Sequence, residues 1–98
     1  MKFHKLLDAV EASGPGSALT VNPMRVDYGR TYPILITGIA AGDVVQLEVC
    51  TTEGGTYVPL DGGEFTEDGA WAIASFYPFI RANVTTYVSG TITVEIGV

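Results

Sequence analysis

The sequence predicts an all-β domain, an antiparallel two-sheet β-sandwich of immunoglobulin-like or jelly-roll-like type, with about eight short strands. Three observations carry this prediction. Apolar and polar residues alternate near the C-terminus, glycine occurs 12 times in 98 residues, and turn-forming residues recur at short intervals. Because a chain of this length builds one hydrophobic core, we expect a single domain.

The clearest pattern lies in residues 79–98. Apolar side chains occupy every second position of 80–84 and again of 92–96. Side chains two residues apart on a strand point to the same face, so each segment has one dry and one wet face. Ser89-Gly90 indicates a short turn between them. We therefore expect a final hairpin in a half-buried antiparallel sheet.

The remaining strands are expected between turns that contain glycine, proline or aspartate. Segment 44–50 is the best candidate for a central strand, because Val45 and Val49 alternate with polar residues. Farther along, Trp71 and Ile73 are expected on one face of their strand. In chain order, the strands expected before residue 79 are 18–21, 24–28, 32–37, 44–50, 56–60, 64–66 and 70–75.

Two of these strands carry more specific signals. Pro33 predicts that segment 32–37 lies at a sheet edge, because proline cannot donate a hydrogen bond to the ladder. The glycines of segment 52–55 predict a hairpin connection to the next strand. On that strand we expect Val58 and Leu60 on the buried face.

The N-terminal residues differ from the rest of the chain. We expect residues 1–17 to form an arm and residues 18–98 to form the sandwich. Leu6, Leu7 and Val10 would lie on one side of a two-turn helix, but so short a helix is marginal alone. An extended arm that pairs with another strand or another chain is the favoured interpretation.

The charge balance limits the classes of partner. With 11 Asp and Glu against 5 Lys and Arg, the net charge is −6, so phosphate backbones are repelled and nucleic-acid binding is not expected. The apolar runs are too short for a membrane-spanning helix. Asp8 and Glu11 interrupt any apolar signal-peptide region, so we expect no export through such a signal.

The residue types needed for catalysis are scarce. Cys50 is the only cysteine and His4 the only histidine, which rules out a zinc set or a nucleophile with a nearby base. We expect no enzyme activity, cofactor or metal, and a packing role for Cys50. The acidic loop residues favour solubility, with a calcium site as the alternative: Glu53, Asp61, Glu64, Glu67 and Asp68.

Aromatic residues allow one further type of site. Tyr57, Trp71 and Tyr87 would form a sugar-stacking platform if they shared a face, although core or interface packing is the more common use of aromatic side chains. Arg81 is expected to pair with a carboxylate such as that of Glu48 or Glu95, fixing the sheet or a subunit contact.

Residues 45–97 resemble small β-sandwich virion proteins of tailed bacteriophages. The resemblance rests on VQLEV, EGGTYVPL, GGEFTEDGAW and FIRANVTTYVSGTITVEI in this order, and LLDAVEASGPGSAL resembles the opening of such proteins. The glycine-rich tip at residues 53–55 departs from the Ser-Asp-Gly form that is common in relatives.

The resemblance implies a structural role in the virion. It suggests a capsid decoration (cement) protein that binds and stabilises the major capsid protein lattice, assembled in the host cytoplasm and located on the capsid surface. A homotrimer is the expected oligomer. A neck or tail protein and a carbohydrate-binding module are the alternatives. The residues expected to contact a partner are Phe3, Leu6, Leu7, Val10, Tyr57, Tyr77, Arg81 and Tyr87.

Overall fold

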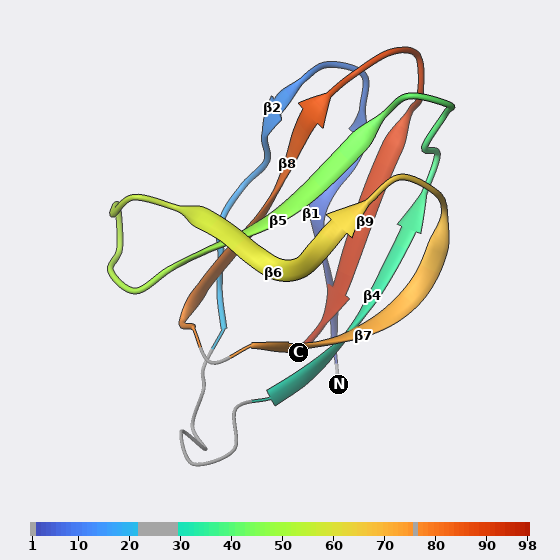
Figure 1. The fold of residues 1–98 in the computed structure, drawn as a ribbon. Coiled ribbons are helices and arrows are strands. Elements are labelled where there is room, and N and C mark those ends of the chain that lie inside the picture. Colours follow the sequence, from blue (N-terminus) through green and yellow to red (C-terminus); the bar gives the residue numbers. More distant parts are fainter. Residues whose placement is uncertain (1, 22–29, 76) are drawn as a thin grey trace.

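A computed structural model describes residues 2–21, 30–75 and 77–98, and every regular element in these residues is a β-strand (Figure 1). The expected all-β, two-sheet architecture is confirmed. The expected strand at 24–28 lies outside the described residues. The strands are β1 (Phe3–Val10), β2 (Gly14–Pro15), β3 (Leu19–Thr20), β4 (Arg30–Thr37), β5 (Val44–Cys50), β6 (Val58–Phe65), β7 (Gly69–Ser75), β8 (Phe79–Thr86) and β9 (Ile92–Gly97).

The strands are divided between two antiparallel sheets. The first sheet has the order β1-β9-β4-β7, and the second has the order β2-β8-β5-β6, with β3 also paired to β8. The first strand thus pairs with the last, β2 with β8, β4 with β7 and β5 with β6. This is the pairing of one long hairpin rolled into two layers, the jelly-roll arrangement.

This topology corrects the prediction of a C-terminal hairpin. β8 lies in the second sheet and β9 in the first, so residues 87–91 cross between the layers. The alternation of buried and outward side chains was predicted correctly on both strands. Alternation fixes which side chains are buried but not which strand lies alongside, so the turn signal at Ser89-Gly90 was misleading.

The core lies between the two sheets and is filled by every second side chain of the long strands. Val45, Leu47 and Val49 of β5 are at most 2% exposed, as predicted. Their counterparts from the first sheet include Ile34 and Ile36 of β4. The other core residues are Leu6, Leu7, Val21, Tyr32, Phe65, Ile73, Ile80, Ala82, Val84, Ile92, Val94 and Ile96.

The N-terminal residues belong to the sandwich. β1 pairs with β9 of the same chain, and Leu6 and Leu7 are 2% and 3% exposed. The extended conformation and the pairing with another strand agree with the favoured interpretation, and the strand that β1 pairs with belongs to the first sheet of the same chain. Register irregularities on either side of Leu7 let two adjacent side chains turn inward, which strict alternation would forbid.

Two other strand predictions need correction. The segments expected at 56–60 and 64–66 are one strand, β6, whose register against β5 shifts near Gly62, a residue with φ of 78°. Val58 is 54% exposed and not buried. β4 lies between β9 and β7, and is therefore not an edge strand; Pro33 precedes the portion that pairs with β9.

Asp43 joins the inter-sheet connections at one end of the sandwich. Its side chain is buried and accepts backbone hydrogen bonds from Ala40, Val88, Ser89 and Gly90. Burial alone would raise the pKa of this carboxyl group, but the four N–H donors together lower the pKa below its ordinary value. The 38–43 connection is thereby fixed to the 87–91 connection.

The same end is closed by further backbone contacts. Thr91 donates its N–H to the carbonyl of Gly38 at 3.0 Å, and Ile39 donates its N–H to Asp68 Oδ1 at 2.8 Å. Asp68 lies in the β6–β7 connection, so three crossings between the sheets meet here. Backbone-to-carboxylate and backbone-to-backbone hydrogen bonds therefore join the connections at this end.

Candidate protein-binding surface

An open apolar groove lies on the outer face of the first sheet. It arises from the same alternation that builds the core: because Ile34 and Ile36 point inward, Pro33 and Leu35 point outward. Phe3 on β1 is 53% exposed and Leu35 is 41% exposed. The residues that line the groove are Phe3, Pro33, Ile34, Leu35, Ala70, Trp71 and Ala72.

Gly97 lies on β9, between the strands that carry the two walls of this groove. It lies opposite Phe3 in the β1–β9 register, one residue beyond the Ile96 that faces Ile34. Since glycine has no side chain, β9 places no side chain between Phe3 and the facing end of β4. The groove therefore presents apolar side chains of β1, β4 and β7 without a charged residue among them, a composition typical of protein-binding surfaces.

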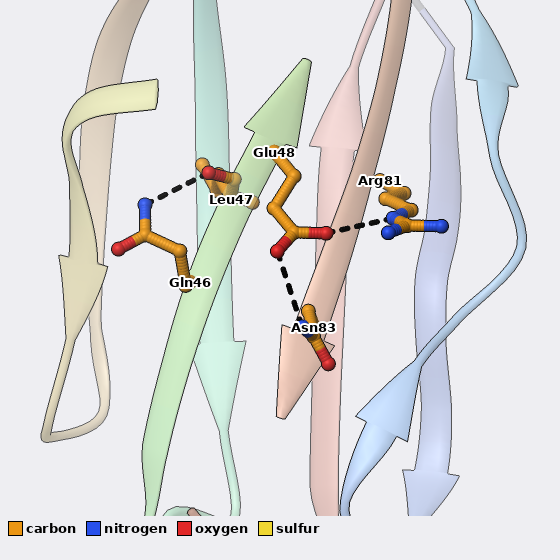
Figure 2. Close-up of polar contacts among 5 residues, drawn as sticks. All are labelled: Gln46, Leu47, Glu48, Arg81 and Asn83. Atoms are coloured by element: carbon orange, nitrogen blue, oxygen red, sulfur yellow. Dashed lines mark hydrogen bonds and ion pairs between the residues drawn. The ribbon is translucent and has the colours of Figure 1, made fainter. Parts of the chain in front are cut away.

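The outer face of the second sheet carries a polar cluster (Figure 2). Arg81 of β8 donates from Nε to Glu48 Oε1 of β5 at 2.7 Å, and Asn83 donates to Glu48 Oε2 at 3.1 Å. The Tyr57 ring lies against the guanidinium, 4.2 Å from Arg81 Cζ. Gln46 donates to the carbonyl oxygens of Leu47 and Leu60.

The members of this cluster contact one another. The expected Arg81–Glu48 pair is present, and the Glu48 side chain is only 11% exposed. Burial raises the pKa of the Tyr57 hydroxyl; a nearby Cys50 thiol raises it further, and Arg81 opposes the rise. These contacts hold the β5–β6 connection on the sheet.

The residues expected to contact a partner are separated by the fold. Phe3 and Tyr77 are exposed, at 53% and 40%, whereas Leu6 and Leu7 belong to the core and cannot reach a partner. Val10 is half-buried against the core. Tyr57 and Arg81 lie together. Tyr87 donates its hydroxyl to the carbonyl of Gly90 at 2.8 Å.

The three aromatic residues of the suggested sugar platform lie in different environments. Tyr57 lies against Arg81, and Tyr87 packs at the 87–91 connection. Trp71 packs on Phe65, with ring centroids 4.5 Å apart. No two of these three rings share a described contact, so the sequence prediction of a common stacking face receives no structural support.

Sequence reasoning did not single out the groove. The outward residues of the groove alternate with inward residues, and sequence analysis considered only the inward residues as core candidates. These outward residues are Pro33, Leu35, Ala70 and Ala72. The signal was nevertheless present, since Pro33 and Leu35 are apolar residues at outward positions of this strand. An apolar residue at an outward position is the mark of a surface that is to be covered.

Chemistry-bearing groups are dispersed over the described residues. In 2–21, 30–75 and 77–98, no three His, Cys, Asp or Glu side chains gather in a way that would hold a metal ion. Cys50 is buried and its thiol donates to the carbonyl of Thr52 at 3.0 Å, as expected of a packing residue. Within the same residues, no helix has the length and apolar character needed to cross a membrane.

Comparisons with protein families, with curated proteins and with solved structures find no match for this chain.

Proposed function

We propose that this protein is a structural virion protein, a capsid decoration protein that binds and stabilises the major capsid protein lattice. The observation that carries the proposal is the charge-free groove on the outer face of the first sheet. A chain with net charge −6 has ample charged residues for its surface, so an exposed groove lined only by uncharged residues suggests a partner that covers it.

The resemblance to small virion proteins supplies the class of partner. The jelly-roll arrangement agrees with it, because this architecture is common in viral capsid domains, but lectins share the architecture too. A fold by itself does not define a function. The dispersed positions of Tyr57, Trp71 and Tyr87 favour the virion protein over the carbohydrate-binding module.

The groove suggests how docking occurs. Phe3 and Leu35 are the large exposed apolar side chains that line it, and they would insert into the junction between capsid subunits. Burying an apolar side chain of this size stabilises a complex by about 1.5–3 kcal/mol. The acidic remainder of the molecule would stay in solvent, where it opposes nonspecific association.

The test is binding to empty capsid shells assembled from the major capsid protein of the same genome. We expect the wild-type protein to sediment with shells but not with unassembled capsid subunits. Leu35→Lys would weaken binding by at least about tenfold, because it places a charge in the groove. Val58→Lys, an equal change on the second sheet, would leave binding unchanged.

Two outcomes would overturn the proposal. One is the absence of any binding to shells by a folded protein. The other is equal loss of binding in Leu35→Lys and Val58→Lys, which would mean that added positive charge and not the groove determines association. Binding to purified neck or tail complexes instead of shells would assign the protein to those parts of the virion.

A further inference from the structure

The edges of the two sheets differ in how they are protected. An edge strand presents unpaired N–H and C=O groups, and proteins block such edges with charges, prolines, bulges or very short strands. β6, at one edge of the second sheet, carries Pro59, Asp61 and Glu64 and an irregular register near Gly62. This edge is well protected against pairing.

The edges formed by the N-terminal strands are protected as well. β1, at the edge of the first sheet, carries Lys5 and Asp8, has two register irregularities and has φ of 51° at Ala9. At the second edge of the other sheet, β2 and β3 contain two residues each, and β2 ends in Pro15. Neither edge offers a long regular ladder.

β7 has none of these protections. Its seven residues contain no charge and no proline. They pair with β4 without a register shift, with Gly69 opposite Ile36 at one end and Ser75 opposite Arg30 at the other. Among the described residues, no strand pairs with its other side. The outward side chains Ala70, Ala72 and Ala74 are exposed and do not obstruct an approaching backbone.

We propose that β7 pairs antiparallel with β7 of a second copy of this chain, about a twofold axis at Ala72. This register pairs all seven residues, with Gly69 opposite Ser75 of the second copy. The first sheets of the two copies then form one continuous sheet. Pairing through β7 leaves no open edge at this strand in either copy.

Charge favours a second copy in the antiparallel orientation. Each chain carries net charge −6, so two copies approach most easily along a strand that has no charge. Glu67 and Asp68 directly precede β7. Antiparallel pairing places the two acidic pairs roughly 25 Å apart, well beyond a screening length of about 8 Å, whereas parallel pairing would place them side by side.

The same symmetry places both apolar grooves on one side of the joined sheet. A twofold axis perpendicular to the sheet keeps the outer face of each copy on the same side. Ala70 and Ala72 belong both to β7 and to the groove, so the two grooves become neighbours across the axis. The pairing does not depend on the proposed virion role.

The first measurement is the solution mass by light scattering at about 100 µM protein. We expect the wild type to have twice the 10.4 kDa mass of one chain. Ala72→Lys places two charges directly opposite each other at the axis and would raise the dissociation constant by at least about tenfold. Val58→Lys adds the same charge to the edge strand β6 and would remain dimeric.

Cysteine cross-linking tests the register independently. Under mild oxidation, Ala72→Cys would form a disulfide-linked dimer, because opposite Cβ atoms on paired strands lie about 4.5–5.5 Å apart. Ala74→Cys would not, because its counterpart lies roughly 14 Å away in this register. Cys50 is buried in the wild type and provides a low background.

Three results would overturn the proposal: a wild-type monomer, a trimer, or a dimer that a folded Ala72→Lys variant retains. Far-UV circular dichroism and the melting temperature of the variant confirm that it is folded. A monomer that recruits a strand of a different protein along β7 would also overturn the assignment of the second copy as the occupant.

Discussion

Glu48 and Arg81 face each other across two adjacent strands, with 2.7 Å between Oε1 and Nε. Both lie on the outer face of the second sheet, yet their side chains are only 11% and 28% exposed. The Tyr57 ring covers the guanidinium. An outward-pointing pair has thus become part of a second, polar layer of packing.

We expect Arg81→Met to lower the free energy of unfolding by about 2 kcal/mol, because Glu48 would remain largely buried without its cation. The double variant Glu48→Leu/Arg81→Met would be less destabilised than Arg81→Met, since it leaves no uncompensated charge. Urea denaturation of the two variants measures both effects.

Lys5→Met is the matched control for Arg81→Met. The Lys5–Asp8 pair is 3.4 Å long, with side chains 52% and 70% exposed, so its loss should change stability by less than about 0.5 kcal/mol. Equal effects of Arg81→Met and Lys5→Met would contradict the structural role of the cluster.

Asp43 should determine the response to acid. Its folded-state pKa is lower than the ordinary value of 3.8, so its stabilisation is complete above the unfolded-state pKa and is lost as pH falls through the folded-state pKa. From about pH 7 to about pH 3, the melting temperature of the wild type should therefore fall more than that of Asp43→Asn. Thermal unfolding across this range provides the measurement.

At neutral pH, Asp43→Asn should reduce the melting temperature by roughly 10 °C, because an amide nitrogen would face backbone N–H donors. Asp61→Asn, a change at an exposed position, should leave the melting temperature nearly unchanged. A parallel acid response in the wild type and Asp43→Asn would show that other carboxylates dominate.

Gly38 and Gly54 allow backbone strain to be separated from steric exclusion. Both have positive φ, 85° and 73°. A Cβ at Gly38 would collide with the carbonyl of Thr91, whereas a Cβ at Gly54 meets no atom within 4 Å. Gly54→Ala should destabilise by about 1 kcal/mol and Gly38→Ala by more than about 3 kcal/mol, as measured by denaturant unfolding. A similar loss of stability in the two variants would rule out a tight contact between the 38–43 and 87–91 connections.

The position of β1 leads to a prediction about core packing. Leu7 is 3% exposed, and Leu7→Ala should lower the free energy of unfolding by about 2–5 kcal/mol. Phe3→Ala, at a position 53% exposed on the same strand, should change it by less than about 1 kcal/mol. If Leu7→Ala were as stable as the wild type, residues 3–10 would not contribute to the core and would be a separate arm.

Local pattern predicted the strands better than it predicted their neighbours. The bounds of β5 and the buried rows of β8 and β9 followed directly from alternation. The partner of β9 did not, because the bonds that turn residues 87–91 across the sandwich come from Asp43, about half a chain away in sequence. Such a contact between a carboxylate and distant N–H groups leaves no periodic trace.

The candidate surface shows a similar division. Residue type predicted the Arg81–Glu48 pair. It also singled out Phe3 and Tyr77, which are exposed. The groove was not predicted, because it depends on Phe3 lying across Gly97 from the facing end of β4, a relationship set by the β1–β9 register. The inward rotation of both Leu6 and Leu7 likewise depends on irregular pairing, which alternation cannot reveal.

The pairing of β1 with β9 also constrains the order of folding. Lys2 and Val98 exchange two backbone hydrogen bonds, and the two ends of the described chain lie together at one end of the molecule (Figure 1). During synthesis, β1 emerges from the ribosome first but has no sheet partner until β9 has been made. The first sheet is therefore completed only after translation of residues 92–97. Pairing between such distant segments is intrinsically slow, and until it occurs Leu6 and Leu7 lack the sheet that buries them.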